Sequence, residues 1–191
     1  MPLPRLRPMT TADIDETTAI ILADDWGDRR SWFEYTIASP ACRPFVAEAS
    51  DGRIAGTGVA TLNGAVAWIG TIWVAPAWRG KGLGRALTEA PIAAAETAGC
   101  RTLVLVATAA GRPLYERLGF ELQTWYRTME APGLDGASTT RASGQRVVRP
   151  WSREDLDAMS TLDAEVTGED RRHLLEAFAS PESARVVVGS D

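Results

Sequence analysis

Histidine and cysteine are scarce in this chain of 191 residues, and each scarcity excludes a kind of chemistry. A single histidine, His173, leaves no histidine metal site and no Ser-His-Asp triad. The two cysteines, Cys42 and Cys100, are too few and too far apart for a metal cluster, and we expect both to be small buried thiols. No metal is therefore expected, and any acid or base must be a carboxylate, a tyrosine or water.

Long apolar runs and an excess of positive charge are also missing. No run approaches the ~20 apolar residues that a membrane span needs, and no apolar stretch follows the N-terminus as a secretion signal would. The net charge of -5 argues against a dedicated nucleic-acid binder, which is usually basic. With 45% hydrophobic residues, the composition predicts a globular cytoplasmic protein that binds neither a membrane nor a nucleic acid.

Two parts of the chain repeat each other in order. Arg7-Pro8, with an acidic pair shortly after, recurs as Arg149-Pro150 at an offset of 142. Asp28-Arg29-Arg30 recurs as Asp170-Arg171-Arg172 at the same offset. An ordered series of this kind predicts a tandem duplication whose second copy stops at about its first hairpin turn.

The segment between the copies, residues 131–145, is rich in Gly, Ser, Thr and Ala and is predicted to be a flexible linker. Residues 1–130 then form a complete domain, and residues 146–191 form a partial second one. So short a piece buries little core by itself. Its apolar strand at residues 184–188 needs a neighbour, so we expect it to dock within the chain or to form a homodimer.

Hydrophobic periodicity and turn signals in the first domain predict the order β-α-α-β-β-β-α-β-α-β. The continuously apolar segment 102–107 is predicted to be a strand buried on both faces. Pro91 should kink its helix or mark the early turns. Expected strands cover residues 3–7, 45–49, 53–62, 65–74, 102–107 and 121–129, and expected helices cover residues 12–24, 29–38, 84–98 and 112–118.

The most informative segment is residues 72–85, in which an apolar strand runs into a glycine-rich loop and a helix begins at once. Free N–H groups at a helix start, flanked by basic side chains, favour binding of a pyrophosphate. A Walker loop would need Ser or Thr directly after a lysine, and a dinucleotide fingerprint would need glycine where Arg85 stands. The loop's glycines are Gly80, Gly82 and Gly84, and its basic residues are Arg79, Lys81 and Arg85.

Residues 79–84 resemble the R/Q-x-x-G-x-G/A motif of the GNAT superfamily of acetyl-CoA-dependent N-acetyltransferases. Val74-Ala75-Pro76 is similar to the exit of that family's central strand, and residues 114–120 resemble its L-Y-E-x-L-G-F segment. The resemblance covers residues 3–130. It implies an α/β fold with a mixed, mostly antiparallel sheet flanked by helices, here followed by part of a second such unit.

The resemblance also implies the site. Backbone N–H groups of the glycine loop would bind the pyrophosphate of acetyl-CoA, and the end of the central strand, splayed by a bulge, would run beside the pantetheine and polarise the thioester. Tyr115 matches the general acid that protonates the departing thiolate, unless it simply packs beneath its helix. The implied cofactor-binding residues are Trp73, Val74, Arg79, Gly80, Lys81, Gly82, Leu83, Gly84, Arg85, Thr108 and Gly111.

Two departures from the family pattern bear on the mechanism. Thr108 stands where many members have an asparagine that binds pantetheine. No carboxylate lies within residues 65–74, where several members carry a base. The base is therefore a distant carboxylate acting through water, or the solvent itself.

The acceptor pocket of this family is built largely from the first two helices and their loop. The acidic and aromatic residues of this loop together suit a cationic amine. An equally good interpretation is that the acidic residues form a solvated turn and that the aromatic residues after it face the core. We expect acetyl transfer to the primary amine of a small molecule; the alternatives are acetylation of a protein or peptide and a non-catalytic acyl-CoA-binding module. The candidate acceptor-binding residues are Asp24, Asp25, Trp26 and Trp32.

Overall fold

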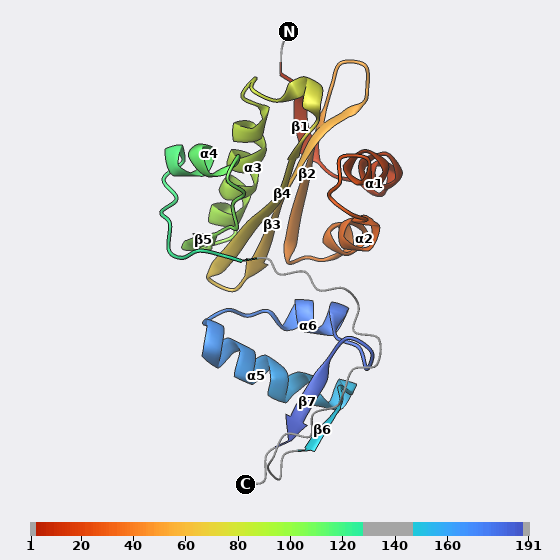
Figure 1. The fold of residues 1–191 in the computed structure, drawn as a ribbon, viewed down its shortest axis with the longest axis vertical. Coiled ribbons are helices and arrows are strands. Elements are labelled where there is room, and N and C mark those ends of the chain that lie inside the picture. Colours follow the sequence, from red (N-terminus) through yellow and green to blue (C-terminus); the bar gives the residue numbers. More distant parts are fainter. Residues whose placement is uncertain (1–2, 128–146, 189–191) are drawn as a thin grey trace. The chain divides into compact units, whose positions relative to one another are not determined.

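The computed structural model describes residues 3–127 and 147–188, which divide near Phe120 into two compact units (Figure 1). The predicted linker, residues 131–145, lies outside the described residues. Within the two described ranges, no helix is both long and apolar enough to cross a membrane.

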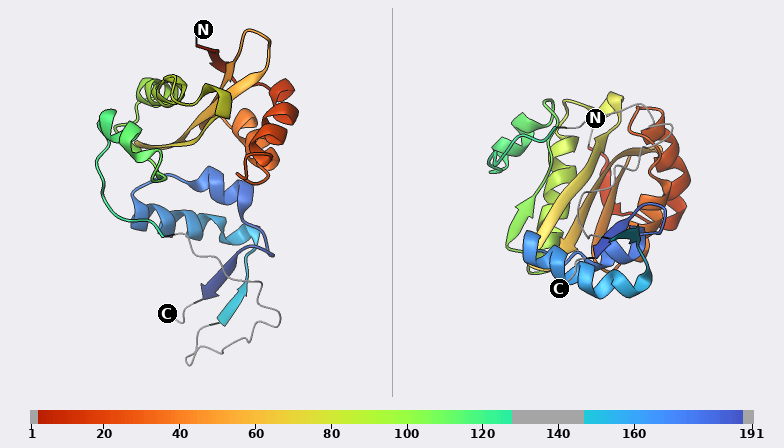
Figure 2. Two further views of the ribbon diagram at one scale, coloured as in Figure 1. Left: turned by 45° about the horizontal axis from the view of Figure 1, so that its top comes forward. Right: turned by 60° about the horizontal axis from the view of Figure 1, so that its bottom comes forward.

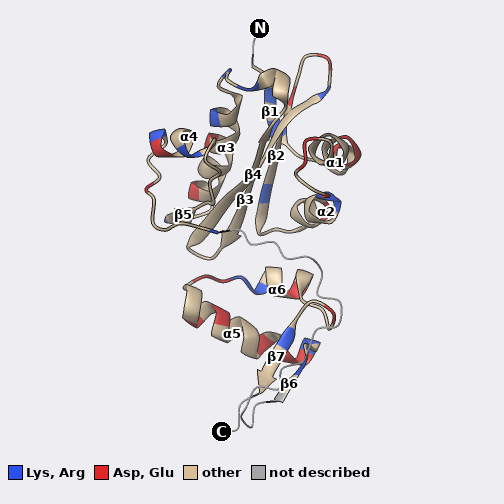
Figure 3. Ribbon diagram, in the orientation of Figure 1, with Lys and Arg blue, Asp and Glu red and all other residues tan. Residues whose placement is uncertain are grey.

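The first unit is built on a five-stranded sheet in the order β1-β2-β3-β4-β5. Its first four strands pair antiparallel and β5 joins β4 in parallel, which confirms the predicted mixed, mostly antiparallel sheet. Neither β3 nor β4 carries a charged residue, and both are tan along their length in Figure 3. The strands are β1 (Arg5–Pro8), β2 (Cys42–Glu48), β3 (Ile54–Asn63), β4 (Val66–Val74) and β5 (Thr102–Val104).

Helices cover both faces of this sheet, with α1 and α2 on one side and α3 and α4 on the other (Figures 1 and 2). Short 3-10 turns, η1 (Thr11–Asp13) and η2 (Pro76–Trp78), precede α1 and the glycine loop. The helices are α1 (Ile14–Leu22), α2 (Arg30–Ala38), α3 (Leu83–Thr97) and α4 (Arg112–Arg117).

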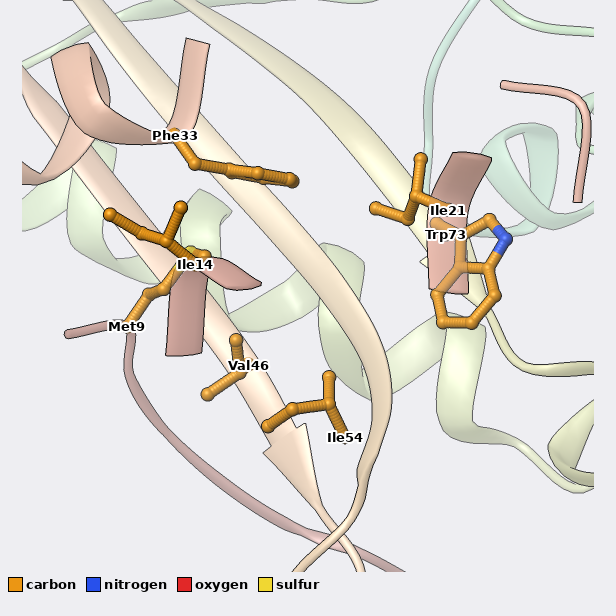
Figure 4. Close-up of a cluster of buried hydrophobic side chains, with 7 residues drawn as sticks. All are labelled: Met9, Ile14, Ile21, Phe33, Val46, Ile54 and Trp73. Atoms are coloured by element: carbon orange, nitrogen blue, oxygen red, sulfur yellow. The ribbon is translucent and has the colours of Figure 1, made fainter. Parts of the chain in front are cut away.

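The core under α1 and α2 is a cluster of seven buried side chains (Figure 4). Ile14 and Ile21, two turns apart on α1, point with Phe33 of α2 toward the sheet. Burial of an Ile or Phe side chain contributes about 1.5–3 kcal/mol, so these contacts fix both helices on the sheet. The cluster consists of Met9, Ile14, Ile21, Phe33, Val46, Ile54 and Trp73.

Helix α3 approaches the other face at two glycines of β3. A Cβ at Gly58 would lie 2.3 Å from the carbonyl oxygen of Leu87, and a Cβ at Gly56 would lie 2.5 Å from the Leu87 side chain. Pro91 has no N–H to donate to the Leu87 carbonyl, and that carbonyl faces Gly58. The helix continues through Pro91 from Leu83 to Thr97. The carbonyl that lacks its helical hydrogen bond therefore lies where the helix contacts the strand.

Two predicted strands were wrong in part. The segment 102–107 forms only the three-residue β5, and Val106 is 54% exposed rather than buried. Its partner β4 pairs with it only as far as Val104, which leaves the next residues no ladder to join. Residues 121–127, expected to begin a strand, have no regular structure and are exposed, and the rest of that expectation lies outside the described residues.

Ion pairs connect β1 with the segment before α1 and with β2 in the first unit. Arg7 of β1 donates two hydrogen bonds to the Asp13 carboxylate at 2.7 and 2.8 Å, and a third to Glu48 at 2.5 Å. Asp13 also accepts from the N–H and hydroxyl of Thr10. The Arg7 hydrogen bonds lower the pKa of Asp13 from 3.8 to about 2. The pair therefore stabilises the fold at neutral pH, and its contribution is lost as the pH falls from about 4 toward about 2.

The second unit repeats this arrangement in its own residues. Arg149 donates to Asp155 at 2.6 and 2.7 Å, and Asp155 accepts from the N–H and hydroxyl of Ser152. Arg149 pairs in register with Val186, as Arg7 does with Val46. The sequence repeat is therefore matched by a repeat of local contacts, and the tandem duplication stays a prediction. The elements of the second unit are β6 (Val147–Pro150), η3 (Arg153–Asp155), α5 (Leu156–Thr167), α6 (Arg172–Phe178) and β7 (Arg185–Val188).

Both cysteines are buried free thiols, as expected. Cys42 begins β2, and burial raises the pKa of its thiol. Cys100 packs against the end of α3, where Ala95 and Ile69 are its neighbours in the core.

We predict that Gly58→Ala destabilises the first unit by about 3 kcal/mol or more, because the added methyl group collides with backbone rather than with a movable side chain. The matched control is Gly70→Ala in β4, where a Cβ meets nothing within 4 Å. Urea unfolding followed by tryptophan fluorescence measures both variants. Equal midpoints for the two would contradict the close approach of α3 to β3.

Candidate functional site

The site begins with a bulge in β4 at Thr71, whose φ is 53°. The register with β3 moves from Val59↔Gly70 to Thr57↔Trp73, so β4 carries an extra residue there. Thr57 donates its hydroxyl to the Thr71 carbonyl at 2.7 Å, and the Trp32 indole donates to the Thr71 hydroxyl at 3.1 Å. Contacts from β3 and α2 therefore hold the bulge, which the family resemblance predicted.

The extra residue reverses which face of the sheet the side chains of β4 occupy. Ala67 and Ile69 lie in the core under α3, whereas Trp73 lies in the core under α1 and α2. An unbroken strand would place residues 69 and 73 on one face, because side chains alternate with a period of two. Trp73 is 3% exposed and contributes to the cluster of Figure 4.

The end of β4 also has an unpaired edge. Its parallel ladder with β5 stops at Trp68↔Val104, while its ladder with β3 continues to Val74↔Gly56. Within the described residues, no strand pairs with the β5 side of residues 70–74. An extended ligand can therefore lie along this edge and bond to backbone groups there.

The glycine loop follows directly. Gly80 and Gly82 have φ values of 71° and 87°, and a Cβ at either would meet nothing within 4 Å. Gly82 caps α3, and in the described structure the N–H groups from Gly80 to Arg85 donate to no protein acceptor. Open space in front of free N–H groups at the start of a 15-residue helix suits a phosphate group.

The third glycine, Gly84, has a packing role. A Cβ there would lie 3.6 Å from both Leu114 of α4 and Val74 of β4. The first turn of α3 is therefore held between the strand end and the helix that carries Tyr115.

The three basic side chains near this loop are all engaged with the protein. Arg79 donates to the Val74 carbonyl and pairs with Asp24. Lys81 donates to the Ala77 carbonyl at 2.7 Å and lies over the Trp78 ring, and Arg85 pairs with Glu89. Attraction of an anion to this loop therefore rests first on the backbone N–H groups.

Tyr115 lies on α4, next to the first turn of α3 in the fold. Its ring packs edge-on against Phe120, and burial raises the pKa of its phenol above the ordinary value of 10.0. A Cβ at Gly111 would lie 3.0 Å from this ring, so that glycine makes room for it. The hydroxyl and the carbonyl of Thr108 both accept from the Gly111 N–H at 3.1 Å, so the residue that replaces the family's asparagine holds the turn that leads into α4.

The four acceptor candidates separate into two pairs. Asp24 accepts a hydrogen bond from Trp73, and Trp32 donates one to Thr71, so both are attached to the end of β4. Asp25, with φ 60°, and Trp26, which is 36% exposed, lie at the surface of the same turn.

Sequence reasoning missed two residues of this site. Thr57 and Thr71 hold the bulge, and a Gly-Thr pair inside an otherwise apolar strand was the available signal. Across residues 3–127 and 147–188, no group of three His, Cys, Asp or Glu side chains could hold a metal ion.

Comparison with known proteins adds the family. The profile of the acetyltransferase (GNAT) family matches residues 10–120. A search of curated proteins finds no match.

Among solved structures, a Pyrococcus horikoshii protein designated an acetyltransferase is 24% identical, with a TM-score of 0.72; the match covers 97% of this chain and 64% of that one. Glucosamine-6-phosphate N-acetyltransferase from Arabidopsis thaliana is 19% identical, with a TM-score of 0.56 over 66% of this chain and 97% of that one. A Clostridium acetobutylicum protein solved with acetyl-CoA is 19% identical, with a TM-score of 0.56 over 65% of this chain and 95% of its own. These likenesses show the fold.

Because burial favours the neutral phenol, we predict that Tyr115 ionises only above pH 10. The difference in tyrosinate absorbance between the wild type and Tyr115→Phe isolates this group during a pH titration. A midpoint below pH 10 would show that the phenol is stabilised in its charged form, and would contradict the buried environment.

Proposed function

Since this chain belongs to the acetyltransferase (GNAT) family, we propose that it transfers the acetyl group of acetyl-CoA to the primary amine of a small molecule. The observation that carries the proposal is the pairing of two features. The unpaired end of β4 and the free N–H groups at the start of α3 lie next to each other in the chain.

Acetyl-CoA, the family's co-substrate, fits the residues present. The N–H groups from Gly80 to Arg85 would bind its pyrophosphate, and positive φ at Gly82 leaves the space for close approach. The backbone of Trp73 and Val74 would run beside the pantetheine. Thr108 and Gly111, at the start of α4, would line the same side.

The chemistry is direct attack of a neutral amine on the thioester carbonyl. A new C–N bond forms, the C–S bond breaks, and coenzyme A departs as a thiolate. A backbone N–H at the end of β4 would stabilise the oxyanion. The half-buried phenol of Tyr115, protonated at neutral pH, would donate its proton to the thiolate, and water would take the proton of the amine.

The acceptor would lie on the turn between α1 and α2. Asp25 and Trp26 present a carboxylate and an aromatic face at its surface, and this pair suits an ammonium group with apolar bulk. The Arabidopsis structural neighbour is named for an amino sugar, which is a small amine. The alternative acceptor is the amine of a protein or peptide, and an acceptor screen distinguishes the two classes.

A non-catalytic acyl-CoA-binding module is the second candidate. Thr108 and the lack of a carboxylate within β4 favour it, because both remove groups that family members use. The second unit, residues 147–188, contains no glycine loop and no counterpart of Tyr115, so its proposed role is architectural. One edge of the strand β7 pairs with β6 of the same chain, and that role includes the predicted docking within the chain or homodimer formation through its other edge.

We predict that isothermal calorimetry detects one acetyl-CoA site per chain and that Gly82→Glu abolishes binding. The new side chain would fill the open space at Gly82, and its negative charge would repel the pyrophosphate. Gly52→Glu is the matched control. That hairpin glycine also has positive φ (83°) and open space at its Cβ, so it suffers the same backbone strain away from the loop. No heat with the wild type at millimolar acetyl-CoA would contradict the proposal.

With an acceptor found by screening amines, we predict that Tyr115→Phe lowers kcat by about 100-fold or more while the KM for acetyl-CoA stays within about twofold. The change removes one hydroxyl and keeps the ring packed on Phe120. Tyr126→Phe removes a hydroxyl from an exposed tyrosine and serves as the control. Unchanged turnover in Tyr115→Phe would remove this phenol from the mechanism.

A further inference from the structure

Asp24 lies in the turn after α1, and its carboxylate reaches the end of β4. Its backbone N–H donates to the carbonyl of the fully buried Ile21 at 3.2 Å, which fixes the turn. Its Oδ2 accepts from the indole N–H of Trp73 at 2.7 Å and from the guanidinium of Arg79. One carboxylate oxygen therefore joins the acceptor turn to two residues on either side of the strand's exit.

Arg79 is the residue directly before Gly80, and its contacts fix the entry to the glycine loop. Its Nε donates to the Val74 carbonyl at 2.9 Å, and its backbone N–H donates to the Pro76 carbonyl at 3.3 Å. The ion pair with Asp24 supplies the remaining restraint on its guanidinium. A charge-assisted hydrogen bond of this kind is stronger than a neutral one.

We propose that Asp24 is a positioning residue for acetyl-CoA binding. Through Arg79 it fixes the start of the glycine loop, and through Trp73 it fixes the strand edge beside the pantetheine. This inference rests on the proposed function. It assigns Asp24 to the coenzyme side of the site rather than to contact with the acceptor.

The neighbouring residue shows why the two acidic side chains of the turn differ. The carboxylate of Asp24 is 25% exposed and accepts two donors. Asp25 follows it with φ 60°, which turns its side chain to the exposed surface. The two carboxylates therefore have different proposed roles. Asp24 fixes the glycine loop, and the exposed Asp25 can bind the acceptor.

A double-mutant cycle tests the coupling. Acetyl-CoA is titrated by calorimetry into the wild type, Asp24→Asn, Arg79→Gln and the double variant of the full chain. Because Asp24 acts through Arg79 as well as through Trp73, each single variant should raise the Kd about fivefold or more, and the double variant should raise it by clearly less than the product of the two single effects.

The matched control is Asp15→Asn. It makes the same change of charge on α1 and breaks an exposed ion pair with Arg30, away from β4. Its Kd should stay within about twofold of the wild type.

A spectroscopic signal follows the other contact without acetyl-CoA. In a 1H–15N spectrum the indole N–H of Trp73, identified with Trp73→Phe, should move upfield in Asp24→Asn, since its bond to a charged acceptor is lost. It should stay in place in Asp15→Asn. A merely structural contribution of Asp24 would lower the unfolding temperature without a change in the Kd of the folded protein.

The outcomes separate the two proposals. No binding by the wild type would overturn the proposed function and this inference with it. Binding by the wild type together with an unchanged Kd in Asp24→Asn, or additive effects in the cycle, would overturn this inference alone. Should Asp24→Asn fail to fold, Arg79→Lys runs the same test, because its single ammonium cannot reproduce a guanidinium bonded to both Val74 and Asp24.

Discussion

Helix α3 can lie directly on β3 because two glycines leave no side chain between them, and the rest of the site depends on that approach. The Leu87 carbonyl occupies the space that a Cβ of Gly58 would need. This contact sets the depth and direction of α3. The first turn of the helix is thereby brought to the end of β4, where Gly84 fits between Val74 and Leu114. A helix displaced by one methyl group would carry the free N–H groups away from the strand edge.

The bulge at Thr71 is the second constraint, and it acts on both faces of the sheet. By adding one residue it moves Trp73 into the core under α1, where the indole meets Asp24. It also ends the ladder with β5, so the strand edge is left for a ligand. Binding surface, core packing and the turn that would hold the acceptor therefore share one local distortion, and hydrogen bonds from Thr57 and Trp32 maintain it.

The incorrectly predicted elements are strands, which form only where a neighbouring strand is available to pair with them. The segment 102–107 has the apolar composition of a strand, but it pairs only through Val104, because its ladder with β4 stops at Trp68. Residues 121–127 have no ladder in the structure and remain irregular. Helix boundaries in the first unit were predicted more closely, since caps and periodicity are local properties. The expected helices 29–38 and 84–98 differ by a residue from α2 and α3.

The glycine loop, the order of the elements as far as α4 and the family could be predicted from the sequence alone, because each depends on residues that are adjacent or regularly spaced. The loop from Arg79 to Arg85 is a single continuous stretch of backbone. The side chains that surround this loop are brought there by the tertiary fold. Asp24 meets Trp73 and Arg79 across 49 and 55 residues of chain, and no spacing in the sequence encodes those contacts. They depend on a one-residue bulge that reverses the faces of β4, and such a reversal is settled by packing against both layers of helices.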